Sequence, residues 1–158
     1  MSVCRVIALR DGAHIAPHKH VSTRARDSMP TPPPAEDRPG KLVVLIMSSD
    51  AVAAALLGAL VETLGYLVRF YHPPETADQA FRRDRPRIAM LDCSDPTMVQ
   101  EELLGRARMR GISVGIFGTA EALRRVRQVA SDHELETLLI AASSQDVDET
   151  LRRICAAE

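Results

Sequence analysis

Short apolar runs alternate with helical segments from Lys41 to the end of the chain, and this alternation limits the fold more than any other feature. Residues 42–47 are all apolar, as a strand buried on both faces requires. Further strands are predicted at 66–71, 87–91, 112–117 and 136–141. Helices are predicted at 51–64, 75–83, 97–110 and 120–130, and from Ser143 or Ser144 onward. Strands that alternate with helices predict an α/β domain with a parallel sheet covered by helices on both faces.

The predicted first helix carries an apolar stripe with a spacing of four residues. The stripe, which we expect to face the sheet, consists of Val52, Leu56, Leu60 and Leu64. Gly65 follows directly. We expect it to end the helix in the left-handed conformation, which glycine adopts without a steric penalty.

Residues 1–40 differ from the rest of the chain and hold six of its ten prolines. Such a segment buries too little apolar surface to offset the entropy of ordering, so we predict a disordered, Pro-rich N-terminal tail. Met29 precedes the proline run, which makes it an alternative start and leaves the membership of residues 1–28 open. Cys4 and the nearby His14, His18 and His20 have the chemistry of metal ligands, but without a second cluster we interpret them as incidental.

The overall composition excludes several classes of protein. A formal net charge of −1 gives no electrostatic reason to expect nucleic acid or a membrane as the partner. No apolar run approaches the ~20 residues of a membrane span, and the N-terminus has no secretory signal. The three cysteines are odd in number and widely spaced, which fits a reducing compartment. We therefore expect a cytoplasmic protein.

The carboxyl ends of the predicted strands are the places where a functional site is expected, because ligands of parallel α/β sheets bind there. One of these ends has a distinctive sequence: residues 88–92 are an apolar strand that closes on Asp92, and Pro96 follows four residues later. This stretch resembles the receiver domain of bacterial two-component response regulators, with Asp92 at the phosphoacceptor position. The resemblance covers residues 41–158, which we take as one receiver-like domain.

The resemblance implies a flavodoxin-like (βα)5 doubly wound sheet with strand order 2-1-3-4-5. It also implies a set of site positions, most of which depart from the family pattern. The acidic pair that holds Mg²⁺ is replaced by Ser48 and Ser49, which we interpret as helix caps, and Asp50 matches only the next position. The Ser/Thr position is Gly118, with Thr119 one residue later. The positions of the lysine and of the switch aromatic are taken by Ala142 and Leu139.

These departures weaken the chemistry expected of a receiver. Asp92 and Asp50 are the candidate carboxylate ligands for Mg²⁺, but the serines bring no negative charge. The chain has two lysines, Lys19 in the tail and Lys41 at the far end of the first strand, roughly 20 Å away at ~3.3 Å per residue. We therefore expect no cofactor. We expect Asp92 to cap the turn after its strand rather than to drive a phosphorylation switch.

Three hypotheses follow. The first is a stand-alone pseudo-receiver without enzymatic activity, which binds a protein such as a histidine kinase or a downstream regulator. The second is a single-domain response regulator phosphorylated on Asp92, and the third is a small flavodoxin-like ligand-binding or enzymatic domain. Two arginine clusters are candidate partner surfaces or simply solvated faces: Arg124, Arg125 and Arg127, and Arg106, Arg108 and Arg110. Cys93 is expected to be a small buried residue.

Overall fold

The computed structural model describes residues 41–156, which form one five-stranded parallel sheet of order β2-β1-β3-β4-β5. The strands are β1 (Val43–Met47), β2 (Leu67–Phe70), β3 (Ile88–Asp92), β4 (Ser113–Gly118) and β5 (Glu136–Leu139). The register sets Met47 beside Leu91 and Asp92 beside Phe117. The carboxyl ends of β1, β3 and β4 therefore lie next to one another, and we call this end of the sheet its carboxyl edge. The predicted strand order is confirmed. The predictions for the tail fall on residues 1–40, outside the described residues.

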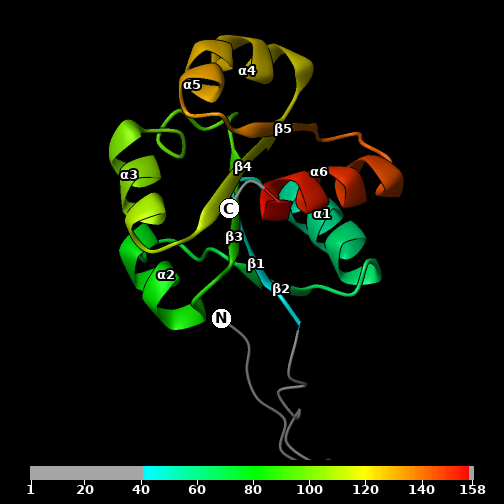
Figure 1. Cartoon of the computed structure of the whole chain (residues 1–158), viewed down its shortest axis with the longest axis horizontal. Helices are drawn as coiled ribbons and strands as arrows, with labels where there is room; N and C mark the ends of the chain where they lie inside the picture. Colours follow the sequence, from blue (N-terminus) through cyan, green and yellow to red (C-terminus); the bar gives the residue numbers. More distant parts are fainter. Residues whose placement is uncertain (1–40, 157–158) are drawn as a thin grey trace, which may run out of the picture. The chain divides into compact units, whose positions relative to one another are not determined.

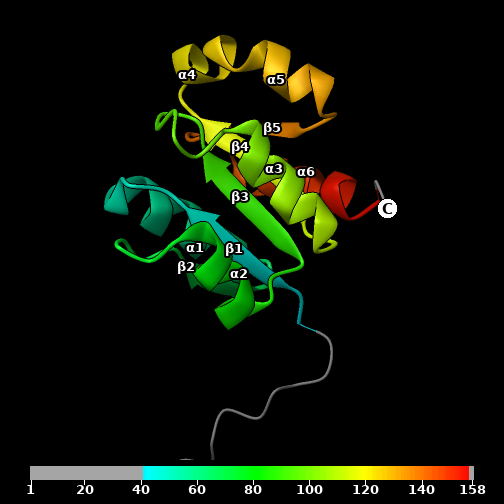
Figure 2. The ribbon, with the colours of Figure 1, turned by 90° about the vertical axis from the view of Figure 1, so that its left-hand side faces the viewer.

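Helices cover both faces of this sheet, as Figures 1 and 2 show. On one face lie α1 (Ala51–Thr63) and α6 (Ser144–Ala156), and on the other lie α2 (Ala77–Asp84) and α3 (Glu101–Met109). Two short helices, α4 (Ala120–Arg125) and α5 (Arg127–Asp132), pack beside β4 and β5. Within residues 41–156, no helix has the length and apolar character needed to cross a membrane.

The core has two layers because side chains alternate along each central strand. Val44 and Ile46 of β1 are buried against α1 and α6, while Leu45 and Met47 are buried against α2 and α3. All five residues of β3 are buried. A continuous apolar run at β1 is therefore explained, since both faces of the strand are covered.

The side of α1 that faces the sheet differs from the prediction. Of the four stripe residues, Leu60 and Leu64 are half-buried against the core. The other two, Val52 and Leu56, are exposed. The buried side instead carries Leu57, Gly58 and Val61. A Cβ atom at Gly58 would lie 2.6 Å from the ring of Phe70 in β2, so the helix can approach β2 only with its glycine inward. Because α1 is apolar on every side, its pattern alone did not fix this orientation.

Three helix boundaries also differ from the predictions, each for a local reason. The helix predicted from residue 75 begins at Ala77, because Thr76 and Gln79 form a capping box. The helix predicted from residue 97 begins at Glu101, because Asp95 caps a separate turn at Thr97. The helix predicted over 120–130 is interrupted at Val126 and continues as α5 to Asp132.

Of three further element ends, two agree with the prediction and one does not. Gly65 has a φ of 92° directly after the end of α1, as predicted for a left-handed cap. Ser143 caps α6, since its hydroxyl accepts the Asp146 N–H at 3.2 Å and the Asp146 carboxylate accepts the Ser143 N–H at 2.9 Å. The fifth strand is shorter than predicted, because an Ala142 N–H to Leu139 carbonyl bond of 2.9 Å turns the chain there.

Candidate functional site

Asp92 ends β3 and is 2% exposed at the carboxyl edge of the sheet. Both of its carboxylate oxygens accept hydrogen bonds. Oδ2 accepts the Ser48 hydroxyl at 2.6 Å, and Oδ1 accepts the Ser94 backbone N–H at 2.8 Å. The bond from Ser94 caps the turn after the strand, which is the contact expected from the sequence. The carboxylate is therefore solvated by two uncharged donors of its own chain.

The Ser48 side chain is fixed in the direction of Asp92. Its hydroxyl oxygen accepts the Asp50 backbone N–H at 3.0 Å, and the residue is 8% exposed. The hydroxyl hydrogen has two acceptors within reach, Asp92 Oδ2 at 2.6 Å and the Asp50 carbonyl at 3.2 Å, and the shorter bond to the charged carboxylate is the stronger one. Ser48 therefore does not cap a helix, as one interpretation of the sequence had it. It links the end of β1 to the end of β3.

Asp50 and Asp95 are the other two carboxylates at this edge, and each is engaged in a local cap. Asp50 is the N-cap of α1, where Oδ1 accepts the N–H groups of Val52 at 2.8 Å and Ala53 at 3.1 Å. Asp95 accepts the hydroxyl and the N–H of Thr97 at 2.6 and 2.9 Å. These bonds lower the pKa of Asp95, with a smaller contribution from the Ser49 hydroxyl.

The oxygen atoms at this end of the sheet do not fit as ligands of a Mg²⁺ ion. Magnesium prefers carboxylate oxygens in near-octahedral arrangement, and here both oxygens of Asp92 accept hydrogen bonds from the chain while Asp50 caps a helix. The two serines offer only neutral oxygens. Over residues 41–156, moreover, no three His, Cys, Asp or Glu side chains are grouped so that they could hold a metal.

Gly118, at the end of β4, faces the sulfur of Cys93. A Cβ atom built on Gly118 would lie 2.5 Å from Cys93 Sγ, closer than real atoms approach. The sulfur therefore occupies the space that a serine or threonine side chain would need at this position. Cys93 is 4% exposed, and burial together with the Asp92 charge raises the pKa of its thiol to about 11. The thiol stays protonated at neutral pH and fills space, as predicted for a small buried residue.

The last two switch positions are also occupied by residues with structural roles. Thr119 is exposed and caps α4, its hydroxyl accepting the Ala122 N–H at 3.2 Å. Ala142 is half-buried in the turn that leads from β5 to α6 and carries no charge. Lys41, the one lysine among the described residues, precedes β1 at the opposite edge of the sheet. No lysine of residues 41–156 is therefore placed near Asp92.

The two arginine clusters predicted as surfaces behave differently. Arg124 and Arg125 on α4 and Arg127 on α5 are exposed, and none forms a hydrogen bond or ion pair within residues 41–156. Arg106 on α3 and Arg110, the residue that follows this helix, both lie near Asp78 of α2, with nitrogen–oxygen distances of 3.9 and 3.0 Å. The second cluster is therefore part of the α2–α3 contact rather than a freely solvated face.

Comparison with known proteins finds the fold but no close relative. No protein-family model matches the sequence, and no curated protein matches it. Among solved structures, the chain is similar to a putative response regulator from Chloroflexus aurantiacus, with 21% identity and a TM-score of 0.61 over 74% of this chain and 99% of that one. A response regulator from Thermotoga maritima gives 13% identity and a TM-score of 0.61 over 73% and 98%.

The chemotaxis response regulator CheY4 of Vibrio cholerae is similar to the same extent, with 16% identity and a TM-score of 0.59 over 73% of this chain and 99% of that one. Three independent receivers are thus covered almost completely by residues of this chain. The fold is that of a response-regulator receiver domain. At such low identities this likeness concerns the fold alone.

Two contacts of the site were not predicted from the sequence. The Ser48–Asp92 bond joins residues 44 positions apart, and its only signal was a hydroxyl at the end of the strand beside that of Asp92. The contact of Cys93 with Gly118 had a clearer signal. Gly118 has no side chain and stands where the receiver pattern has Ser or Thr, and Cys93 directly follows the end of the neighbouring strand β3.

Proposed function

We propose that the protein is a pseudo-receiver that acts as a protein-interaction module in bacterial two-component signal transduction, without Mg²⁺-dependent phosphorylation and without enzymatic activity. The observation that carries the proposal is the 2.6 Å bond between the Ser48 hydroxyl and Asp92. Its partner would be a histidine kinase or a downstream regulator, because these are the proteins that receivers serve.

The chemistry of phosphoryl transfer explains why this bond matters. The accepting carboxylate has to present one oxygen in line with the leaving group. In this chain Oδ2 accepts the Ser48 hydroxyl and Oδ1 accepts the Ser94 N–H, so each oxygen already has a donor. Attack by either oxygen would weaken its hydrogen bond, since an oxygen bonded to phosphorus is a poorer acceptor. The resting state of Asp92 is therefore stabilised against phosphorylation.

Charge neutralisation is missing as well. The oxygens of the transferred group develop negative charge, which a metal ion and a cationic side chain normally offset. Here Ser48 and Ser49 replace the acidic pair, and Ala142 stands at the lysine position. The Cys93 sulfur fills the space beside Gly118, so the movement that a hydroxyl makes at this position has no counterpart. These features support a fixed conformation that a partner binds.

Two exposed surfaces next to this edge suit a protein partner. On α1, Val52 and Leu56 are 68% and 57% exposed, although large apolar side chains usually lie inside. On α4 and α5, Arg124, Arg125 and Arg127 present three cations without partners among residues 41–156. An apolar stripe and a cationic row on one domain fit a partner with a mixed apolar and acidic contact surface.

Incubation with acetyl phosphate and Mg²⁺, followed by intact mass spectrometry, tests the absence of phosphorylation. A receiver with a complete acidic pair and lysine serves as the positive control in the same mixture. We expect the positive control to gain one phosphate while this chain keeps its mass. An added phosphate that disappears in Asp92→Ala would overturn the proposal in favour of a phosphate-accepting response regulator.

Partner binding is tested with cross-linking in cells of the source organism and identification of the linked proteins. We expect a two-component protein to be recovered equally well with the unchanged chain and with Asp92→Ala, because the interaction does not depend on phosphorylation. The charge reversals Arg124→Glu, Arg125→Glu and Arg127→Glu should reduce recovery. Arg152→Glu on α6 is the matched control, since Arg152 is already paired with Asp148 at 2.6 Å. Recovery that requires Asp92 would contradict the proposal.

A further inference from the structure

A pocket of about 580 Å³ lies at the end of the sheet opposite to Asp92, where α2 runs into β3 and α3 runs into β4. Three arginines stand around it: Arg82, Arg85 and Arg110. Its floor is made by the buried residues Phe81, Pro86 and Ile112. We refer to this site as the arginine pocket. Its volume lies in the range of about 300–1,000 Å³ that is typical of small-molecule sites.

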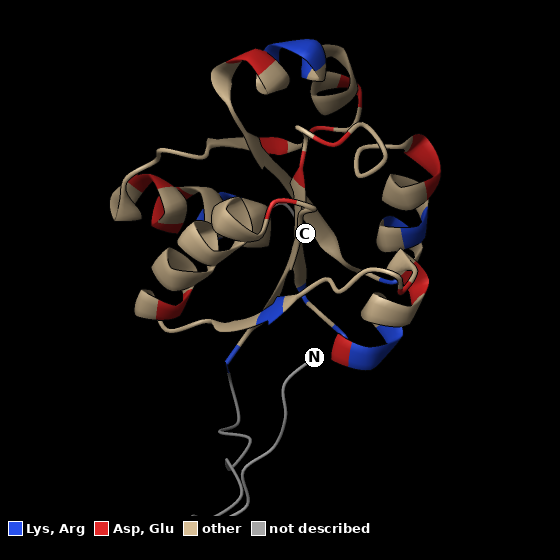
Figure 3. Ribbon diagram, turned by 180° about the vertical axis from the view of Figure 1, so that it is seen from behind, with Lys and Arg blue, Asp and Glu red and all other residues tan. Residues whose placement is uncertain are grey.

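The carboxylates near the arginine pocket already form ion pairs, one with the pocket's own Arg110 and one with Arg83, which lies outside the lining. Asp78 binds Arg110 at 3.0 Å, and Asp84 binds Arg83 at 2.6 Å. Arg82 and Arg85 have neither a hydrogen bond from their guanidinium groups nor an ion pair within residues 41–156. Figure 3 shows this concentration of basic residues at the end of α2 and in the loop that follows it. The pocket therefore has an excess of positive charge.

The backbone at Arg85 gives a second, independent observation. Arg85 follows α2 in the left-handed conformation, with φ 44° and ψ 52°, and its N–H bonds to the Phe81 carbonyl at 3.0 Å. Glycine and asparagine are the usual residues at this position, because other side chains are strained there. A cation at a helix C-terminus interacts favourably with the helix dipole, which accounts for Arg82. It does not account for a strained arginine at the residue that ends the helix, next to Pro86.

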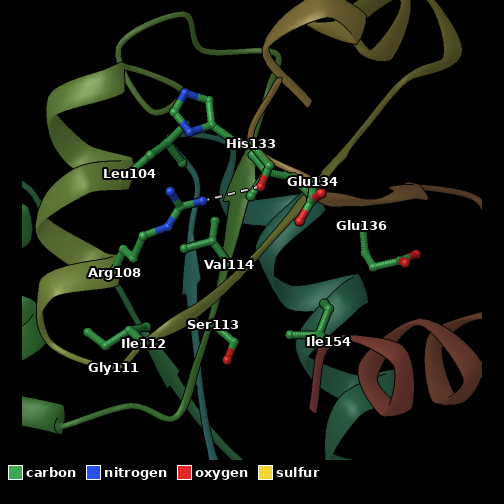
Figure 4. Close-up of a pocket in the computed structure, with 11 residues that line it drawn as sticks. Leu104, Arg108, Gly111, Ile112, Ser113, Val114, His133, Glu134, Glu136 and Ile154 are labelled. Carbon is green, nitrogen blue, oxygen red and sulfur yellow. Dashed lines mark hydrogen bonds between the residues drawn. The ribbon is translucent and has the colours of Figure 1, made fainter. Parts of the chain in front are cut away.

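A neighbouring pocket shows by contrast what is unusual here. It has a volume of about 300 Å³ and lies between α3 and the start of β5 (Figure 4). Its arginine, Arg108, donates to the His133 carbonyl at 3.5 Å, and two carboxylates, Glu134 and Glu136, line the same pocket. One arginine against two carboxylates gives no attraction for an anion. The arginine pocket has three arginines and no carboxylate in its lining.

We propose that the arginine pocket binds a polyphosphate group, either free or as part of a nucleotide. The planar guanidinium group donates two parallel hydrogen bonds to phosphate oxygens, and several such groups together match a ligand with several negative charges. Arg82 and Arg85 supply these donors without giving up an existing ion pair. Arg110 adds a third while Asp78 holds it in place. This site is separate from the Asp92 site and does not depend on the function proposed for it.

Isothermal titration calorimetry on the full chain tests the assignment with four probes: sodium tripolyphosphate, ATP, adenosine and citrate. We expect tripolyphosphate and ATP to bind, with an affinity that decreases as salt is added, and adenosine not to bind. Equal binding of tripolyphosphate and ATP identifies the phosphate chain as sufficient. Binding of ATP alone identifies a nucleotide as the source. Citrate, a trianion without phosphate, controls for charge. Citrate binding as tight as that of tripolyphosphate would overturn the assignment to phosphate.

The matched variants are Arg82→Gln with Arg85→Gln, and Arg124→Gln with Arg125→Gln. Both pairs remove two exposed charges, so the fold should be retained, which a thermal melt verifies. The first pair should weaken binding about tenfold or more, since it removes charge-assisted bonds, and the second should leave it unchanged. The proposal is wrong if neither phosphate probe binds at millimolar concentration, or if both pairs of variants have the same effect.

Discussion

At the carboxyl end of the sheet each of the three carboxylates accepts hydrogen bonds from donors of the chain itself, whereas at the amino end the guanidinium groups of Arg82 and Arg85 have no partner among residues 41–156. Asp92 is also buried, at 2% exposure, while both arginines are exposed to water. The two ends thus carry opposite charges. The negative charges at the carboxyl end accept hydrogen bonds from the chain itself, whereas the positive charges at the amino end have no bonding partner among residues 41–156.

This difference in burial means that the Asp92 end contributes to the stability of the fold, whereas the arginine end has charges that can bind a ligand. A buried carboxylate without donors is costly, so the bonds to Asp92 are required for the fold whether or not a ligand exists. Exposed guanidinium groups are solvated by water and require no partner, so Arg82 and Arg85 contribute little to the fold. We propose on this basis that the end where a receiver handles phosphate is inactive in this chain, and that the opposite end is the one that attracts an anion.

The largest change is expected from restoring the receiver chemistry at the carboxyl end. Ser48→Asp, Ser49→Asp and Ala142→Lys together replace the missing acidic pair and cation. We expect this triple variant to become phosphorylated on Asp92 by acetyl phosphate, because it regains the charges that hold the metal and offset the phosphoryl oxygens. Intact mass spectrometry should show one added phosphate, against none in the unchanged chain.

Metal binding gives this variant a second readout. A carboxylate at position 48 would be pushed against Asp92, which now lies 2.6 Å from the Ser48 oxygen, so the variant should be less stable than the unchanged chain without metal. Mg²⁺ should restore its melting temperature while leaving the unchanged chain unaffected. The same variant carrying Asp92→Asn is the control for the site of modification. A triple variant that folds but gains neither phosphate nor Mg²⁺ stabilisation would contradict the account of why the site is closed.

The next largest effect is expected at Gly118. Gly118→Thr would place a Cβ atom 2.5 Å from Cys93 Sγ and should lower the free energy of unfolding by about 1–3 kcal/mol. Adding Cys93→Ala removes the sulfur and should recover most of that loss, although Cys93→Ala alone leaves a cavity and destabilises. Urea unfolding of the two single variants and the double variant measures the coupling. Additive effects would show that the sulfur does not hold this position.

The parallel sheet was predictable from local sequence, and its strand order was implied by the resemblance to receiver domains. The buried run at β1, the segment of residues 88–92 and the helices between the strands specify a parallel sheet whatever the details of packing. The orientation of α1 was not predictable in the same way. An inward face is found from a contrast between apolar and polar sides, and Val52, Leu56 and Leu57 are equally apolar. The contact of Gly58 with Phe70 decides between them, and it exists only in the folded chain.

The candidate site shows the same division. Position in the chain placed Asp92 at a strand end, and its distance from Pro96 supported the receiver resemblance. What the surrounding residues do depends on tertiary contacts. Ser48 was interpreted as a cap because serine commonly caps helices, yet Asp50 takes that role and leaves Ser48 to bond Asp92. A hydrogen bond between residues 44 positions apart has no local pattern from which it can be predicted.

A smaller effect is expected from removing the Ser48 hydroxyl. Ser48→Ala leaves Asp92 Oδ2 without its donor in a buried position and should lower the free energy of unfolding by about 1–2 kcal/mol. In the Asp92→Ala background the same change should have little effect, since the acceptor is gone. Ser49→Ala is the matched control, because Ser49 is exposed and its hydroxyl bonds Asp95 rather than the buried Asp92. Equal losses in both backgrounds would mean that Ser48 stabilises the fold through Asp50 alone.

The smallest effect is expected at the amino end and has the opposite sign. Arg85→Gly should raise the free energy of unfolding by about 0.5–1 kcal/mol, because glycine adopts a φ of 44° without strain and the guanidinium group has no ion pair to lose within residues 41–156. Arg85→Ala removes the same charge but keeps the strain, so it should leave stability nearly unchanged. Urea unfolding of the three proteins separates the two contributions. A loss of stability in both variants would show that the Arg85 side chain supports the fold, and the contrast between the two ends of the sheet would no longer hold.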